Sequence, residues 1–216
     1  MDFNQIKEGL LSIAPKGYQI KDYPGGFMLQ QKAKLLTYNI GINYLDYSPK
    51  YLFTAMTAGI YFEQVQQILD PLLGEHLQIR NENQFNSTLA QSFAFSKQMM
   101  RKGIYSTEDL TTLLVEAKVK MDQDIDQWFS AHHNLEEVVE KVKNWSFKKR
   151  AASLGKVHAD MKMLILFWIT GDHLAYQIFK AQALQKYEGA VQKTPQLQKY
   201  LNLIQAIIDH LEKQEI

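Results

Sequence analysis

The chain has 216 residues, of which 46% are hydrophobic and 12% aromatic, and this composition is typical of a folded globular protein rather than a disordered segment. Its 24 lysine and arginine residues nearly balance 23 aspartate and glutamate residues, which argues against nucleic acid as a main partner, because nucleic-acid-binding domains are usually strongly basic. Cysteine is absent, so thiolate catalysis, zinc–thiolate sites and iron–sulfur sites are excluded.

The N-terminus and the apolar runs predict a cytoplasmic protein. Residues Met1 to Gln5 are polar and do not begin a basic region followed by an apolar one, as a signal peptide does. The longest apolar run, Met163 to Ile169, is far shorter than the roughly 20 residues that a membrane-spanning helix needs. We therefore expect no membrane contact.

The first predicted elements are a helix and a β-hairpin. Apolar residues recur at helical spacing from Phe3 to Ile13, Asp2 is placed to cap this helix, and Pro15 and Gly17 end it. From Tyr18 the spacing of apolar residues changes to every second position, as in a β-strand. The turn residues Pro24 to Gly26 then predict a hairpin whose second strand covers Phe27 to Gln31.

Two longer strands follow. From Leu36 to Tyr44 apolar residues alternate with Thr37, Asn39, Gly41 and Asn43, so we expect one face to pack on apolar residues and the other to meet water. The strand from Tyr51 to Tyr61 is apolar on both faces, which indicates a central position in the sheet.

The next segment predicts a helix and then a further β-region. Apolar residues from Phe62 to Leu72 lie on one helical stripe, and Pro71 is expected to end or kink that helix because proline disfavours helical geometry at the residue before it. Gly74 to Ser96 predicts one or two further strands, with a loop over Asn81 to Asn86.

After Gly103 the pattern is helical. Ser106 and Asp109 resemble a capping box before a long apolar stripe from Leu110 to Phe129, and Asn134 is placed to cap a shorter helix. The next helix begins at Lys156 or Val157. Its Met161–Ile169 segment is apolar almost all round, which indicates the middle of a core. Asp172 is expected to cap its antiparallel partner, and Thr194 with Pro195 opens the last helix.

These elements predict an α+β fold with an N-terminal helix and an antiparallel sheet of about four to six strands, packed with a C-terminal bundle of about five helices. Because the sequence contains no linker or low-complexity tract, we expect a single domain over residues 1–216, with a β-rich half (1–102) and a helical half (103–216).

No motif predicts a catalytic, cofactor-binding or metal-binding residue. His158 and Asp160 precede the buried helix and Asp172 and His173 follow it, so roughly 15–20 Å of helix separates the two pairs and they cannot share one metal. The neighbouring His132 and His133 are interpreted as a solvated helix end, and Asp122, Asp124 and Asp126 as solvated side chains on different faces of a helix.

One segment is both basic and aromatic, with Lys141, Lys143, Trp145, Phe147, Lys148, Lys149 and Arg150. Basic residues interleaved with aromatic ones can hold a nucleic-acid backbone while the rings stack on bases. The interpretation that we prefer places Trp145 and Phe147 in the core between helices, with solvated lysines beside them.

Tyrosine is plentiful in the β-rich half. Because tyrosine offers a large contact area with a polar tip, it is enriched at protein interfaces. It is also a good strand former. We predict that part of this sheet contacts a protein partner or a second copy of the chain, through Tyr38, Tyr44, Tyr51 and Tyr61.

The order of elements resembles uncharacterised bacterial α+β families of unknown function, some of which look like immunity proteins encoded beside polymorphic toxins. The residues that carry the resemblance are Gly17-Tyr18, Leu36–Ile42, Val65–Leu73, Trp128-Phe129, Asn134 and Gly171-Asp172. The resemblance implies an inhibitor that binds a partner protein, and it implies no catalytic residue.

Two functions therefore remain open. The first is a non-enzymatic protein-binding module, an immunity or regulatory protein that uses its aromatic β part and needs no cofactor. The second is an enzyme or a small-ligand-binding protein with a dispersed site between the sheet and the helices. A pocket with convergent polar side chains favours the second, and a flat tyrosine-rich surface favours the first.

Overall fold

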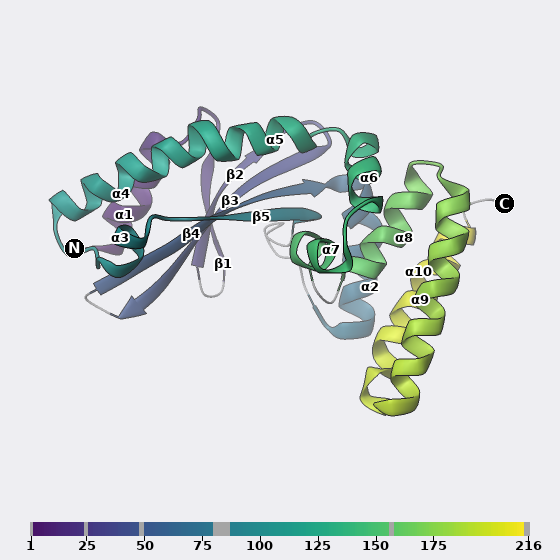
Figure 1. Ribbon diagram of the computed structural model, residues 1–216. Coiled ribbons are helices and arrows are strands. Elements are labelled where there is room, and N and C mark those ends of the chain that lie inside the picture. Colours follow the sequence, from purple (N-terminus) through teal and green to yellow (C-terminus); the bar gives the residue numbers. More distant parts are fainter. Residues whose placement is uncertain (1, 24–25, 48–49, 80–86, 156–157, 214–216) are drawn as a thin grey trace. The chain divides into compact units, whose positions relative to one another are not determined.

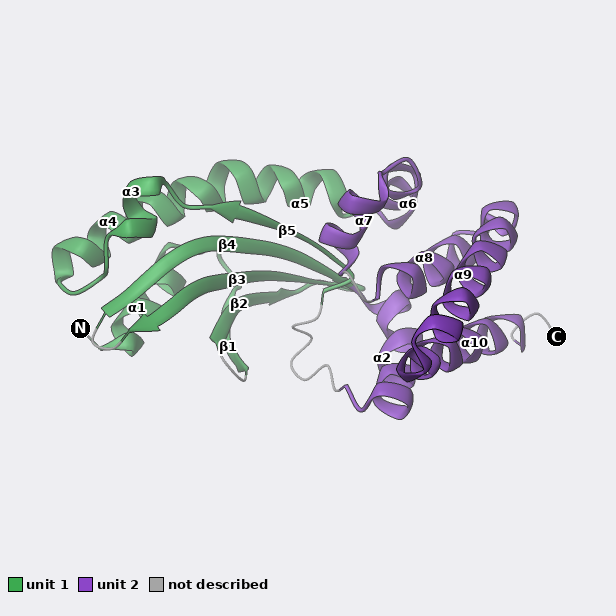
Figure 2. Cartoon of the chain, turned by 60° about the horizontal axis from the view of Figure 1, so that its bottom comes forward, with its two compact units in different colours: residues 1–61, 82–133 green, residues 62–81, 134–216 purple. Residues whose placement is uncertain are grey.

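The computed structural model describes residues 2–23, 26–47, 50–79, 87–155 and 158–213 (Figure 1). The chain divides into two compact units, each made of two segments (Figure 2). Unit 1 contains residues 1–61 and 82–133, and unit 2 contains residues 62–81 and 134–216. The two units are described separately.

Unit 1 opens with helix α1, Phe3–Ile13, as predicted. The Asp2 side chain accepts a hydrogen bond from the backbone N–H of Asn4, and Gln5 completes a capping box by accepting from the Asp2 backbone. Ile6 and Leu10 are fully buried, so the apolar stripe of this helix faces the core of the unit.

The sheet has five antiparallel strands in sequential order: β1 (Gln19–Tyr23), β2 (Gly26–Lys32), β3 (Leu36–Tyr47), β4 (Lys50–Phe62) and β5 (Leu89–Ala94). Strand β4 lies between β3 and β5, which confirms the central position predicted from its two apolar faces. The described residues of the segment 74–96 contribute one strand, β5, and the loop predicted at 81–86 lies outside the described residues.

The prediction that the polar face of β3 meets water is wrong at the start of the strand. Thr37 is fully buried and Asn39 is 3% exposed. Asn39 accepts a hydrogen bond from Gln30 Nε2 at 3.1 Å and donates one to Ser87 Oγ at 3.1 Å. Polar side chains can be buried when they satisfy one another in this way, and a single strand does not reveal such partners.

Three helical stretches complete unit 1 after the short helix α3, Lys97–Arg101. They are α4 (Thr107–Val119), the π-helix η2 (Lys120–Ile125) and α5 (Asp126–His132), which follow one another without a break along the sheet (Figure 1). The long apolar stripe predicted from Leu110 to Phe129 therefore spans three elements. Gly9 of α1 lies against Leu114 of α4, where an added methyl group would be only 3.1 Å from that side chain.

Unit 2 is helical. Its elements are α2 (Glu63–Leu77), α6 (Leu135–Lys143), α7 (Phe147–Leu154), α8 (Ala159–Ile169), α9 (His173–Lys193), the short 3₁₀ turn η3 (Pro195–Leu197) and α10 (Gln198–Glu212). Helix α8 is buried along nearly its whole length and packs against α2, α7, α9 and α10, which confirms its predicted place in a core. Asp172 caps α9 by accepting a hydrogen bond from Ala175 N at 3.2 Å.

Of the two outcomes predicted at Pro71, an end or a kink of the helix, the end does not occur, because α2 continues through Pro71 to Leu77. Proline removes one backbone hydrogen bond, but Leu69 and Leu73 on either side of it are buried. Burial of this apolar face compensates for the lost bond, and the helix ends at Gln78, which has the left-handed conformation common at helix ends.

The structure confirms the α+β class, with an N-terminal helix, an antiparallel sheet and several C-terminal helices. The boundaries between the units fall elsewhere than the predicted division at residues 102 and 103, because α4, η2 and α5 belong to the unit that holds the sheet. That the chain acts as one domain stays a prediction. Within the described residues, no helix combines the length and apolar character needed to cross a bilayer.

Candidate functional site

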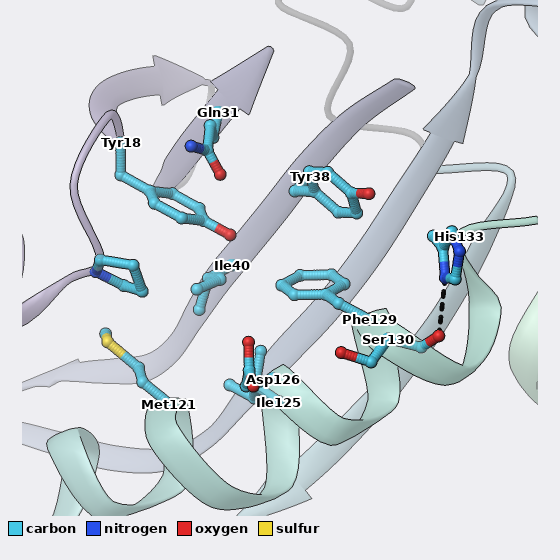
Figure 3. A pocket seen from close by; sticks show the side chains of 11 residues that line it. Tyr18, Gln31, Tyr38, Ile40, Met121, Ile125, Asp126, Phe129, Ser130 and His133 are labelled. Atoms are coloured by element: carbon cyan, nitrogen blue, oxygen red, sulfur yellow. Dashed lines mark hydrogen bonds between the residues drawn. The ribbon is translucent and has the colours of Figure 1, made fainter. Parts of the chain in front are cut away.

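A cavity of about 390 Å³ that is open to solvent lies in unit 1, between strands β2 and β3 on one side and η2 and α5 on the other (Figure 3). The lining residues Asp126, Ser130 and His133 are exposed. Side chains from the sheet, from the turn before β1 and from the helices surround it. The lining residues are Pro15, Tyr18, Gln31, Tyr38, Ile40, Met121, Ile125, Asp126, Phe129, Ser130 and His133.

The turn between α1 and β1 places Tyr18 at the cavity. Gly17 has a φ of 99°, a conformation that favours glycine, and a Cβ added there would come within 2.8 Å of Gln31 Nε2. Glycine therefore allows the turn to lie against Gln31, which donates a hydrogen bond to Lys16 O at 3.2 Å. These contacts hold Tyr18 and Gln31 on the same wall.

The helical wall depends on η2. A π-helix has a wider turn than an α-helix and often occurs at functional sites. Met121 and Ile125 of η2 are buried and line the cavity, while Asp126 follows at the start of α5. Phe129 continues this wall, and its ring meets the Tyr38 ring of β3 edge-on with the centroids 4.9 Å apart.

Two polar groups converge on the apolar floor of the cavity. In Figure 3 the Tyr18 hydroxyl points into the space beside Ile40 and Phe129, and the Asp126 carboxylate rises towards the same space from α5. Burial raises the pKa of Tyr18 well above its ordinary value of 10.0, and nearby Tyr38 and Asp126 raise it further. The Tyr18 hydroxyl is therefore neutral at physiological pH and can both donate and accept a hydrogen bond.

His133 supplies a further acceptor. Its Nδ1 lies 2.6 Å from Ser130 O, and because a carbonyl oxygen can only accept, Nδ1 carries the proton. When the ring is neutral, Nε2 is then the nitrogen that accepts a hydrogen bond. Among the described lining residues none is lysine or arginine, so Asp126 gives the cavity an acidic character.

The four predicted partner-contact tyrosines occupy different places. Tyr38 lines the cavity, whereas the Tyr44 and Tyr51 rings each lie 4.8 Å from the Phe3 ring of α1. Tyr61 is 8% exposed. Sequence patterns indicated the strands that carry these residues, but they did not indicate that only Tyr38 joins Tyr18 and Asp126 at the cavity.

A buried group of ionisable residues in unit 2 was not predicted. Lys162 of α8 is 5% exposed, and its Nζ donates a hydrogen bond to Leu154 O at 2.8 Å. Burial lowers the Lys162 pKa to about 7, although the nearby Asp70 carboxylate acts in the opposite direction. Burial and the Lys162 charge also lower the pKa of His158. The only signal in the sequence is a lysine within an otherwise apolar helix.

The described residues contain no group of three or more histidine, aspartate or glutamate side chains arranged to hold a metal ion. His158 and Asp160 lie at the start of α8, while Asp172 and His173 lie after its end, as their spacing predicts.

Comparison with known proteins identifies no relative: no family model, no curated protein and no solved structure matches the chain. The resemblance to immunity-like families therefore stays a prediction, and the function is argued from the site.

Proposed function

We propose that this chain binds a small organic molecule in the cavity of unit 1, and that the ligand carries an amine on a flat apolar body. The observation that carries the proposal is the convergence of the Tyr18 hydroxyl and the Asp126 carboxylate over an apolar floor. A volume of about 390 Å³ lies within the range of roughly 300–1,000 Å³ common to ligand pockets.

The apolar part of the lining supports a flat body. Ile40 comes from the sheet, Met121 and Ile125 come from η2, and the Phe129 ring stands edge-on to Tyr38. Methionine adapts its shape to different partners, and aromatic rings offer faces on which a flat ligand can lie. A compact ring system therefore suits this floor better than a long polar chain does.

The polar part supports an amine. Asp126 accepts hydrogen bonds, as does Nε2 of His133 when that ring is neutral, and the described lining has no lysine or arginine to pair with an anion. An ammonium group can pair with Asp126 and also lie over an aromatic face, an attraction worth about 0.5–2 kcal/mol. An anionic ligand would meet repulsion from the same carboxylate.

Protein binding through the aromatic β part remains the second candidate. Leu45 and Tyr47, at the end of β3, are 49% and 60% exposed, and exposed apolar side chains of this kind favour a protein contact. Tyr44 and Tyr51 pack with Phe3, which leaves less of their ring surface for a partner. Contact through the four predicted tyrosines stays a prediction.

Three indole compounds that differ mainly in charge test the proposal: tryptamine, its neutral alcohol analogue tryptophol, and indole-3-acetate. Titration calorimetry and ligand-observed NMR should show saturable binding in the order tryptamine, tryptophol, indole-3-acetate. Asp126→Asn should weaken tryptamine binding about tenfold, because it removes a charge-assisted hydrogen bond, and should change tryptophol binding little. Tyr18→Phe should weaken both.

Tyr105→Phe is the matched control, since Tyr105 belongs to unit 1, is 53% exposed and does not line the cavity. Its ligand affinities should equal those of the unmodified chain. The proposal is wrong if none of the three compounds binds saturably, or if tryptamine binding is unaffected by Asp126→Asn.

A further inference from the structure

Unit 2 contains a locally basic segment that the balanced total charge conceals. From Lys141 to Ala159 the sequence has six lysine or arginine residues and no aspartate or glutamate. Helix α7 contains three of them: Lys148, Lys149 and Arg150. A local excess of one charge sign attracts ligands of the opposite sign even when the net charge of the protein is close to zero.

The preferred interpretation of the aromatic residues in this segment is wrong for Phe147. It was expected to fill the core, but it is 60% exposed at the start of α7. Trp145 is partly exposed, with Lys149 Nζ 4.3 Å from its ring centroid. A large exposed aromatic ring among cations does not contribute to core packing and is available to a ligand.

A groove of about 340 Å³ connects this segment with α8 and α9. Phe147 and Arg150 line it from α7, Asp160 from α8, and Phe179 and Lys186 from α9. Arg150 Cζ lies 5.9 Å from the Phe179 ring centroid, and Lys186 Nζ lies 5.0 Å from the Phe147 ring centroid. Each ring of the groove is thus paired with a cation.

The charges of the groove do not cancel. The Asp160 carboxylate accepts hydrogen bonds from Lys186 and from the Tyr187 hydroxyl, so its charge is already engaged. Arg150 forms no ion pair with any carboxylate in the described part of the chain. The groove therefore keeps a net positive charge beside two aromatic rings.

We propose that this groove binds one nucleotide, with its aromatic base against Phe147 and its phosphate on Arg150. Base–aromatic stacking next to cations is the chemistry by which proteins hold single-stranded nucleic acid, and the planar guanidinium of arginine suits a phosphate. The volume is that of a small ligand site, which fits one nucleotide. The nucleotide is either free or part of a single strand. This inference is independent of the amine site in unit 1.

Binding assays with a free nucleotide and with an oligonucleotide test the proposal. Adenosine, AMP and a fluorescein-labelled dA12 strand are titrated with the full chain, using NMR for the small molecules and fluorescence anisotropy for the strand. Both phosphorylated probes should bind more tightly than adenosine, and their binding should weaken with salt. Equal affinities for AMP and the strand indicate a free nucleotide, whereas a tighter strand indicates a nucleic-acid contact.

Variants distinguish binding by base stacking from binding by electrostatic attraction alone. Phe147→Ser and Arg150→Gln should each weaken binding about tenfold, because each removes one part of the recognition. A dA12·dT12 duplex, whose bases are covered, should bind less tightly than the single strand. The matched controls are Leu174→Ser, which removes an apolar side chain that is 74% exposed on α9, and Lys193→Gln, which removes one charge at the end of α9. Neither should change the affinity.

The proposal fails if AMP and dA12 bind no better than adenosine, or if the duplex binds as tightly as the single strand. It also fails if Phe147→Ser has the same affinity as Leu174→Ser. Circular dichroism of each variant checks that the helices are intact. Because Phe147 is exposed, its replacement should not unfold the protein, and a change in affinity would then reflect the loss of the ring.

Discussion

Lys162 lies near the start of the largely apolar helix α8, where water cannot solvate its charge. Its Nζ has a backbone partner, Leu154 O, and faces Asp70 and His158. Burying an ammonium group costs free energy even with such partners, and the group responds by losing its proton more easily. The protein therefore contains a titrating group inside its core.

This environment predicts that stability increases with pH above neutrality. The Lys162 pKa is about 7 in the folded protein against an ordinary value of 10.5, so between these values the unfolded chain binds more protons. The free energy of unfolding should then rise by up to about 1.4 kcal/mol per pH unit from pH 7 towards pH 10. Urea unfolding at several pH values measures this slope.

Lys162→Met is the variant for this experiment, because methionine has a similar length and carries no charge. Its unfolding free energy should be nearly independent of pH over the same window. His158, whose pKa is lowered from 6.5, titrates below pH 7 and so does not affect the comparison. The same slope in the variant and the unmodified chain would contradict the prediction.

At the scale of elements, α4, which precedes η2 and α5, begins with a capping box. Ser106 Oγ accepts a hydrogen bond from Asp109 N at 3.2 Å, and Asp109 Oδ2 accepts from Ser106 N at 3.1 Å. This confirms the capping box that the sequence indicated, with aspartate in place of the usual glutamate. Lys102 Nζ adds an ion pair to Asp109 at 2.7 Å.

Removal of this cap should destabilise the protein by a predictable amount. Ser106→Ala leaves the first turn of α4 without one hydrogen-bond acceptor and should lower the free energy of unfolding by about 1 kcal/mol. Ser153→Ala, inside α7 rather than at its start, is the control and should change stability by less than about 0.5 kcal/mol. Urea titrations measure both, and equal effects in the two variants would show that the cap contributes nothing.

At the scale of the whole molecule, the two units are joined at three places in the chain: after residues 61, 81 and 133. Strand β4 ends at Phe62 and α2 begins at Glu63, so no loop separates the sheet from the first helix of unit 2. Because each unit is formed from two segments, neither is a continuous piece of chain. We expect the units to unfold together.

The three tryptophans allow this expectation to be measured. A chain that keeps only Trp128 reports on unit 1, and a chain that keeps only Trp168 reports on unit 2. Leu164→Ala, a change of a fully buried residue in unit 2, should cost about 2–5 kcal/mol and shift the urea midpoints of both probes equally. A shift confined to the Trp168 probe would mean two independently folding domains.

Local sequence patterns were sufficient for most of the secondary structure. The apolar period of two identified β2 and β3, and apolar residues on both faces identified β4. Helical spacing with a cap at Asp2, Asn134 or Asp172 identified α1, α6 and α9. These signals depend on residues within a few positions of one another, so one sequence contains them. The local signals fail at Thr37 with Asn39, which are buried, and in the continuation of α2 past Pro71, because tertiary burial overrides a local preference there.

By itself the sequence determined the α+β class, the order of the elements and the absence of thiol chemistry, since each follows from residue types and their spacing. Only the tertiary structure decided which side chains share a site. Tyr18 and Asp126 are distant in the chain and meet because η2 and α5 lie against the sheet, and Phe147 is exposed because of how α7 packs. Such convergence depends on packing between distant segments, and the period of a strand or a helix does not encode it.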